Sequence, residues 1–348
     1  MAPLVLGLSV LASACGVLGS GGNSNATAAD IYSTVPSLAD VRTLMGDNNW
    51  WEGPPSFEVP PLNSDTVPVT QRYSVSQYYD HIGTAEQLLV RYTFYDLTSS
   101  ATTQMTDLKN AFGTSPTSPA VGDQVLYYGL GGSGATPIIT RTFVRVGQVI
   151  TTLVWSVKDN IPTVSQLGKV ASKFTSGLKN LGKTHHQLAR VDRTLQPPPG
   201  LDITPLGFTQ LPVETFALMT LTALPDTIVA LLRQSGITSF AYGDYALNND
   251  TQMEVQTALL TFSSTAAASD WATTFSPDTP DSAGIGWKYV PIGGSPAAGV
   301  YHYVFSSGQY GGYLVCRANH EGVAASRECE DPTHTTAVAW KLALSGVG

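Results

Sequence analysis

The sequence predicts an α+β protein with two tandem, similarly ordered domains, each an antiparallel sheet with flanking helices. Residues 140–157 (TRTFVRVGQVITTLVWSV) have the pattern of a β-hairpin, and a second copy with the same pattern occurs at residues 303–318 (YVFSSGQYGGYLVCRA). Strand-like segments are grouped with helices beside them, which favours antiparallel sheets covered on one face over a parallel sheet. The length of 348 residues also exceeds that of a usual single core.

Each hairpin is expected to turn at a Gly-Gln pair, at Gly147-Gln148 in the first copy and Gly308-Gln309 in the second. Gly supplies the positive φ that a tight turn requires. The apolar, aromatic and Thr-rich flanks are typical of half-buried strands. The two segments are therefore expected to be equivalent hairpins.

The first half is expected to begin with an amphipathic helix at residues 37–46, because Ser37 is a good N-cap and Gly46 a good helix end. Residues 47–68 contain two Pro-Pro pairs and are expected to be irregular. The remaining predicted elements are strands at 72–79, 87–95 and 124–129, helices at 101–112 and 163–181, and the hairpin.

The second half repeats this order. Its predicted elements are helices at 226–234, 265–275 and 335–344, strands at 239–245, 252–262 and 287–291, and the second hairpin. The helix ends DLKNAF (107–112) and DWATTF (270–275) align at nearly the offset that superposes the hairpins, which suggests a duplication. The apolar run 213–224 has no counterpart and is expected to be a packing helix between the domains.

The expected organisation is a signal peptide at 1–14, a flexible tether at 15–34, a first domain at 35–182, a Pro-rich linker at 183–205 and a second domain at 206–348. The linker contains Pro197-Pro198-Pro199-Gly200, which is typical of a polyproline spacer.

The N-terminus indicates export. Residues 4–14 are apolar and too short to span a bilayer, and Ala12-Ser13-Ala14-Cys15 resembles the lipobox at which bacterial lipoproteins are cleaved and acylated. We therefore expect Cys15 to be the lipid attachment site on the outer face of the cell membrane. Ala12 stands where the lipobox prefers Leu, and no Lys or Arg precedes the apolar run, so a secretory peptide cleaved after Ala14 is the alternative.

The three cysteines fit this interpretation. Once Cys15 is assigned to a lipid, Cys316 and Cys329 remain, and in an oxidising compartment they are expected to form a disulfide that ties the last helix to the sheet. The alternative is a zinc site formed by these two cysteines with His320 and His334. An exported chain without a compact finger pattern favours the disulfide.

Composition and motifs exclude several functions. The formal charge of −8 and the scattered basic residues argue against nucleic acid as a partner. No G-x-S-x-G or H-E-x-x-H signature is present, and GLGGSG at residues 129–134 lacks the Lys-Ser/Thr of a phosphate loop. No catalytic residue, metal ligand or cofactor is therefore predicted.

Aromatic pairs are the candidates for lining a ligand cleft, with core packing as the alternative. The pairs are Trp50-Trp51, Tyr78-Tyr79 and Tyr127-Tyr128. The histidines are expected to be solvated or satisfied by neighbours and not ligands. These are His81, His185, His186 and His302.

Val121-Gly122-Asp123, followed by VRVGQV at residues 144–149, resembles the paired strand motifs of extracellular sensor-like domains in actinobacterial lipoproteins and receptor serine/threonine kinases. The resemblance covers residues 35–181 and, more faintly, 225–344, where Ser306-Ser307 replaces the Arg-containing step. It implies an envelope-exposed binding or sensing module without known catalysis, whose partners are the membrane and a small-molecule, cell-wall or protein ligand. The alternative is an exported enzyme, possibly zinc-dependent, with an unrecognised active site.

Overall fold

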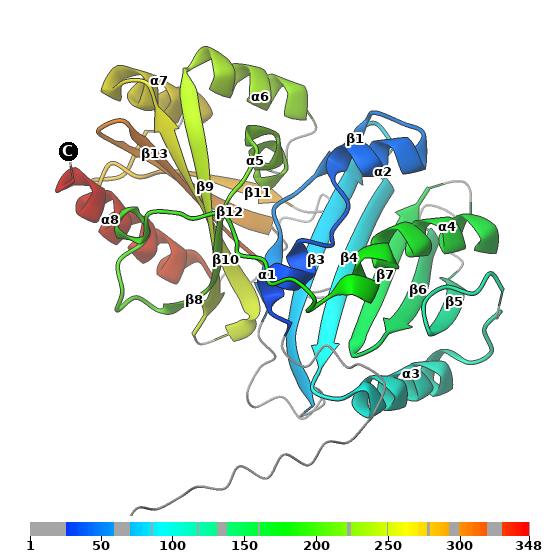
Figure 1. The fold of residues 1–348 in the computed structure, drawn as a ribbon. Coiled ribbons are helices and arrows are strands. Elements are labelled where there is room, and N and C mark those ends of the chain that lie inside the picture. Colours follow the sequence, from blue (N-terminus) through cyan, green and yellow to red (C-terminus); the bar gives the residue numbers. More distant parts are fainter. Residues whose placement is uncertain are drawn as a thin grey trace, which may run out of the picture.

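The computed structural model describes residues 26–58, 70–84, 86–116, 118–130, 138–158, 161–220, 224–248, 250–276, 279–291, 299–318 and 329–347. Each half of the chain forms an antiparallel sheet with helices beside it (Figure 1). The predicted α+β class with two sheets in sequence order is therefore confirmed. The predicted signal peptide and Cys15 lie outside the described residues, and the domain limits stay a prediction.

The first sheet has seven strands in the order β1-β3-β4-β7-β6-β5, with β2 paired to β3. The strands are β1 (Trp50–Glu52), β2 (Ser56–Glu58), β3 (Gln71–His81), β4 (Glu86–Tyr95), β5 (Gln124–Leu130), β6 (Ile138–Val146) and β7 (Val149–Val157).

The second sheet has six strands in the order β11-β12-β13-β10-β9-β8. The strands are β8 (Ile203–Gln210), β9 (Ile237–Leu247), β10 (Asp250–Phe262), β11 (Gly286–Pro291), β12 (Gly299–Ser307) and β13 (Tyr310–Ala318). The run β5-β6-β7-β4-β3 of the first sheet thus has the same order as β11-β12-β13-β10-β9 of the second. Gly147 and Gly308 turn the matching hairpins with φ of 59° and 56°. This shared strand order supports the duplication that the sequence suggested.

The helices of the first half are α1 (Ala28–Tyr32), α2 (Leu38–Met45), α3 (Thr98–Phe112) and α4 (Val164–Thr175). Those of the second half are α5 (Val213–Met219), α6 (Pro225–Gln234), α7 (Thr265–Phe275) and α8 (Glu330–Ser345). The predicted start and end of α2 are confirmed. Ser37 and Asp40 form a capping box, and Gly46 closes the helix with φ of 74°. Within the described part of the chain, no helix has the length and apolar character that crossing a bilayer requires.

Both faces of each sheet are covered, so the expectation of one covered face is wrong. In the first sheet Phe143 packs with α3, whereas its neighbour Val144 points the other way, into the cluster that contains Val170 of α4. In the second sheet Leu314 packs toward α8 and Val315 toward the cluster that contains Trp271 of α7. Successive side chains of a strand point to opposite faces, so apolar residues on both sides require a helix on each.

Four segments differ from the prediction. Residues 47–68 were expected to be irregular, but β1 and β2 add short strands to β3 on either side of Pro54-Pro55. The predicted tether contains α1, which begins with a capping box between Thr27 and Asp30. Strand β8 begins inside the predicted linker, and the predicted packing helix at 213–224 is α5, which ends at Met219.

One apolar cluster runs through both halves and includes Tyr79 and Phe174 from the first and Phe216 and Tyr242 from the second. The linker is also packed. Leu195 accepts a hydrogen bond from Trp340 Nε1 at 2.7 Å, and the Arg193 guanidinium lies 3.7 Å from the centre of the Phe208 ring. Residues 183–205 are therefore part of the folded structure and not a free spacer.

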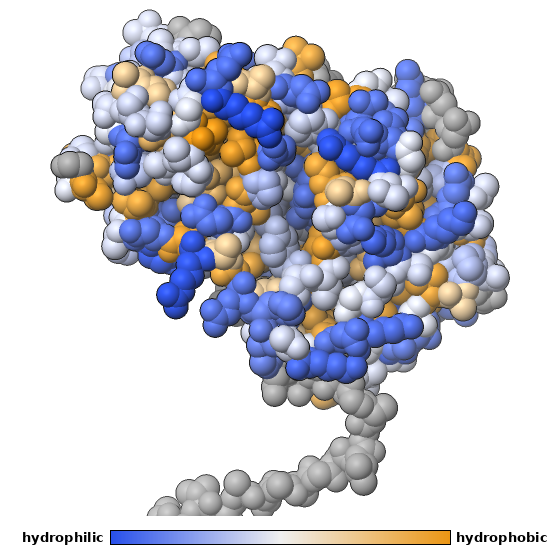
Figure 2. All heavy atoms as spheres, turned by 45° about the horizontal axis from the view of Figure 1, so that its top comes forward, coloured by the Kyte–Doolittle hydropathy of each residue, from blue (hydrophilic) through white to orange (hydrophobic). Residues whose placement is uncertain are grey.

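The surface carries polar and apolar residues in small, interspersed groups on the face shown in Figure 2. The large exposed apolar residues come from separate elements and include Leu97, Ile161, Leu224 and Leu342. Scattered apolar residues of this kind are normal on a water-exposed surface.

Candidate functional site

Residues 54–58 of the first half are held against the second sheet. The Phe57 N–H donates to Asp244 Oδ2 at 2.5 Å, and Ser56 Oγ donates to Glu254 Oε1 at 2.8 Å. The Tyr242 hydroxyl donates to the Pro55 carbonyl at 2.6 Å. This short segment, which we call the β2 strap, fixes one half to the other.

The carboxyls that hold the strap are buried. Asp244 is 0% exposed and Glu254 1% exposed, and burial raises the pKa of both carboxyls. The charges of Glu254 and Glu58 raise the pKa of Asp244 further, and the charge of Glu58 raises that of Glu254. The charge of Arg317 lowers the pKa of Glu254 and so partly offsets the effect of burial. The Arg317 guanidinium also donates to the Tyr78 hydroxyl at 2.9 Å. These groups are enclosed by protein and serve the contact between the halves.

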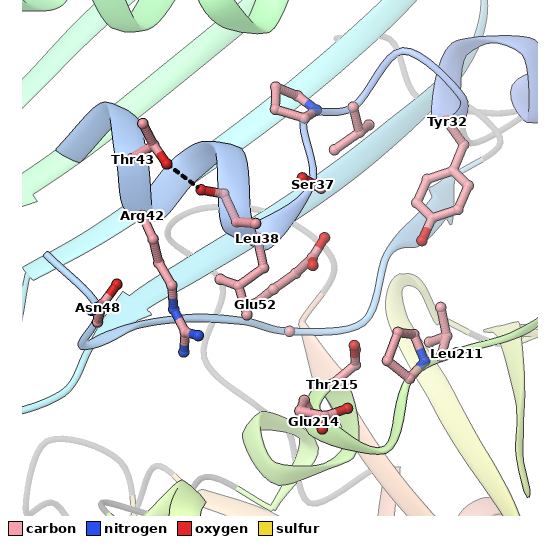
Figure 3. Close-up of a pocket in the computed structure, with 15 residues that line it drawn as sticks. Tyr32, Ser37, Leu38, Arg42, Thr43, Asn48, Glu52, Leu211, Glu214 and Thr215 are labelled. Carbon is pink, nitrogen blue, oxygen red and sulfur yellow. Dashed lines mark hydrogen bonds between the residues drawn. The ribbon is translucent and has the colours of Figure 1, made fainter. Parts of the chain in front are cut away.

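A cavity of about 770 Å³ lies beside this contact (Figure 3). Its walls come from α1 and the start of α2, from β1, and from the turn that joins β8 to α5. The polar side chains at the wall include Tyr32, Ser37, Arg42, Asn48, Glu52 and Thr215. Val35, Leu38, Leu211 and Pro212 supply apolar surface. A cavity of this volume, with mixed lining and at a junction of two halves, is typical of small-molecule sites.

Local geometry places Glu52 in the wall. It pairs with Tyr79 at the end of β1, and the chain then passes directly over the ring of Tyr78. A Cβ at Gly53 would lie 1.9 Å from that ring, so only glycine fits there. The strand therefore ends with the Glu52 side chain directed toward the cavity.

The carboxyl of Glu52 has no hydrogen bond or salt bridge with any described residue. Burial raises its pKa from 4.5 to about 7. Burial and the charge of Glu52 together raise the pKa of Tyr32. In Figure 3 the Tyr32 hydroxyl and the Glu52 carboxyl come from opposite walls and extend into the same space. Near neutral pH this carboxyl can therefore exist in either protonation state.

Arg42 lies at another part of the wall and does not neutralise Glu52. Its Nε donates to the Trp50 carbonyl at 2.9 Å, and its guanidinium lies 5.4 Å from the centre of the Trp51 ring. The pKa of Glu52 is shifted by burial and not by a neighbouring cation. Glu214, which also lines the cavity, forms an ion pair with Arg233.

The aromatic pairs that the sequence singled out do not line this cavity. Trp50 and Tyr79 are 2% and 0% exposed and belong to the core, and Tyr127 and Tyr128 are also buried. Trp50 borders a second cavity of about 380 Å³, together with Trp155 and Lys169. Core packing, the alternative left open for these pairs, is the better description of them.

The side chains of His81, His185 and His302 have protein partners, and the backbone N–H of His186 donates to Asp30. His81 Nε2 lies 2.9 Å from Asp47, and His185 Nδ1 lies 3.0 Å from Asp30. His302 is buried beside the Tyr313 hydroxyl.

Cys316 and Cys329 are joined by a disulfide, with their Cα atoms 6.0 Å apart. Cys329 immediately precedes α8 and Cys316 is on β13, so the bridge ties this helix to the sheet. Both sulfurs are used in this bond, and His334 Nε2 lies 2.6 Å from Asp281. His320 and the loop GLGGSG from residue 131 on lie outside the described residues. Within the described ranges, no group of three His, Cys, Asp or Glu side chains could hold a metal ion.

Glu52 and Tyr32 were not predicted as site residues from the sequence. The signal available for Glu52 was a single acid between Trp51 and Gly-Pro-Pro, in a segment otherwise suited to burial. Nothing local marked Tyr32, because the cavity forms from segments more than 150 residues apart.

No protein-family model matches the sequence, and no curated protein matches it. Among solved structures, the extracellular domain of PknH from Mycobacterium tuberculosis matches with 12% identity. The match covers 45% of this chain and 99% of that chain, with a TM-score of 0.36. A similarity of this size does not establish a shared fold, so function has to be argued from the residues of this chain.

Proposed function

We propose that this chain is an exported envelope protein, anchored by a lipid at Cys15, that binds a small molecule between its two halves and acts as a non-catalytic binding or sensor-like module. The observation that carries the binding function is the 770 Å³ cavity with the unpaired Glu52 in its wall. The low charged content of 13% and the disulfide between Cys316 and Cys329 support export.

The cavity suits binding better than catalysis. Acid–base enzymes set the pKa values of two neighbouring groups apart so that one donates a proton and the other accepts it. Among the described residues of this wall, Glu52 faces the hydroxyl of Tyr32, whose pKa is raised, and the second acid, Glu214, is already paired with Arg233. An exported enzyme remains the second candidate, because a carboxyl with a pKa of about 7 also suits a general acid or base.

A cavity-filling variant tests the binding function. Ala39 is exposed on α2 and lines the cavity, so Ala39→Trp should block it without disturbing the core. Thr103→Trp, at an exposed position of α3, is the matched control. A fragment library observed by protein NMR should give ligands that bind the wild type and the control but not Ala39→Trp.

Two results would contradict the proposal. One is a library that yields no ligand for the wild type. The other is a set of ligands that bind Ala39→Trp as well as they bind the wild type, because they would then occupy some other part of the surface. Turnover of a bound fragment that stops in Glu52→Gln would favour the enzyme instead.

A further inference from the structure

We infer that the cavity between the two halves binds its ligand through a protonated amine, which the Glu52 carboxylate holds as a counter-charge. This inference rests on the proposed binding function and names the chemical class of the ligand.

Glu52 lacks the ion-pair partner that three other partly or fully enclosed acids have. Glu58 is paired with Arg91 at 2.9 Å, Asp30 with His185 at 3.0 Å, and Asp281 with His334 at 2.6 Å. Glu52 has no such partner among the described residues, and its carboxyl faces a cavity large enough for a ligand. A buried charge is normally paired, so a cationic group of the ligand is the missing partner.

The cavity also offers acceptors for the hydrogen bonds that an ammonium group needs. It has three donors and no acceptor. The Glu52 carboxylate accepts, and the Tyr32 hydroxyl, which extends into the same space, can accept as well (Figure 3). Charge-assisted hydrogen bonds of this kind are about twice as strong as neutral ones.

Other ligand classes do not suit this point of the wall. An anion would meet the negative charge of Glu52. A divalent cation requires about six oxygen ligands, whereas the second carboxylate of the described wall, Glu214, is paired with Arg233. A neutral alcohol would leave the carboxylate without a counter-charge.

The rest of the wall defines the body of the ligand. Val35, Leu38 and Leu211 supply apolar surface to the same cavity. The guanidinium of Arg42 is anchored to the Trp50 carbonyl and the Trp51 ring, on another side of the cavity in Figure 3. The ligand class is therefore a small primary amine with an apolar body.

The test compares n-hexylamine with n-hexanol, which match in length and differ in the charged group. Binding is measured at pH 8 by NMR titration of the full folded chain, in the wild type, in Glu52→Gln and in Asp270→Asn, which changes an exposed acid of α7 outside the cavity. The wild type should bind the amine at least about tenfold more tightly than the alcohol, as expected for one charge-assisted hydrogen-bond pair. Glu52→Gln should lose this preference, and Asp270→Asn should keep it. Amide spectra of each variant check that it is folded.

The outcomes separate the inference from the proposed function. Equal binding of amine and alcohol by the wild type, or a preference for the amine that survives in Glu52→Gln, overturns the inference. If neither probe binds but library fragments still bind in a manner that Ala39→Trp blocks, the amine inference falls and the binding function stands. If no library fragment binds either, both the amine inference and the proposed binding function are wrong.

Discussion

Replacing Glu52 by Gln should stabilise the protein at pH 8 and leave its stability nearly unchanged at pH 4. The pKa of Glu52 is about 7 in the folded protein, raised from 4.5 because burial disfavours the charged carboxylate. Between pH 4.5 and about 7, Glu52 is protonated in the folded chain and ionised in the unfolded chain. The free energy of unfolding of the wild type therefore falls as the pH rises from about 4.5 through 7. Glutamine has nearly the same shape as glutamate and cannot ionise, so the Glu52→Gln variant should not show this fall in the free energy of unfolding.

The size of the effect follows from the shift. Each pKa unit corresponds to about 1.36 kcal/mol, so a full shift from 4.5 to about 7 amounts to about 3 kcal/mol. Glu52 faces a cavity that solvent can enter, which reduces the penalty. We expect Glu52→Gln to raise the free energy of unfolding at pH 8 by about 1–3 kcal/mol.

The measurement is urea unfolding followed by tryptophan fluorescence at several pH values between 4 and 8. The buried carboxyls of Asp244 and Glu254 also titrate, but they are present in both proteins and cancel in the difference. Glu214→Gln is the control and should lose at most about 1 kcal/mol, since it breaks an exposed ion pair. A Glu52→Gln effect that is the same at pH 4 and pH 8, or that is destabilising at pH 8, would refute the reasoning from burial.

Four further predictions address anchoring, covalent structure and packing. Mass spectrometry of the membrane fraction should find a mature chain that begins with a lipidated Cys15, and a soluble chain that begins elsewhere would contradict this. Replacing Cys316 and Cys329 together by Ser should lower the free energy of unfolding by about 2–5 kcal/mol; if His334→Ala alone costs as much, a metal site and not a disulfide is present. A single proteolytic cut within residues 183–205 should leave both fragments in one particle in gel filtration, because they share a core, and separate elution would show that they do not. Gly53→Ala should destabilise by about 1–3 kcal/mol through overlap with Tyr78, whereas Gly129→Ala, which meets no atom within 4 Å, should not; similar losses in both would remove the steric explanation.

Elements defined by local chemistry could be predicted from the sequence. Helix α7 runs from Thr265 to Phe275, as predicted, because Ser264 caps its first turn and apolar residues recur along one face. The two hairpins were predicted because Gly147 and Gly308 are required at their turns. Helix caps and turns depend on residues that are neighbours in the sequence, so the sequence alone is enough to predict them.

Elements defined by distant partners could not be predicted. Strands β1 and β2 have three residues each and exist because β3 offers an edge to pair with. Strand β8 begins inside the segment predicted to be a linker, and it pairs with β9. The aromatic pairs carried no information about which residues would be enclosed, because both faces of each sheet are covered. The cavity could not be predicted either, because Glu52 and Thr215 come to line it only when the two halves pack together.

The cavity and the contact between the halves are linked by one short, restrained segment. Glu52 ends β1, and Phe57, five residues later, donates its N–H to Asp244 of the second sheet. The intervening chain has little freedom, because Gly53 lies against the Tyr78 ring and Pro54-Pro55 have fixed φ angles. The same short segment therefore contributes both to the cavity wall and to the contact between the two halves.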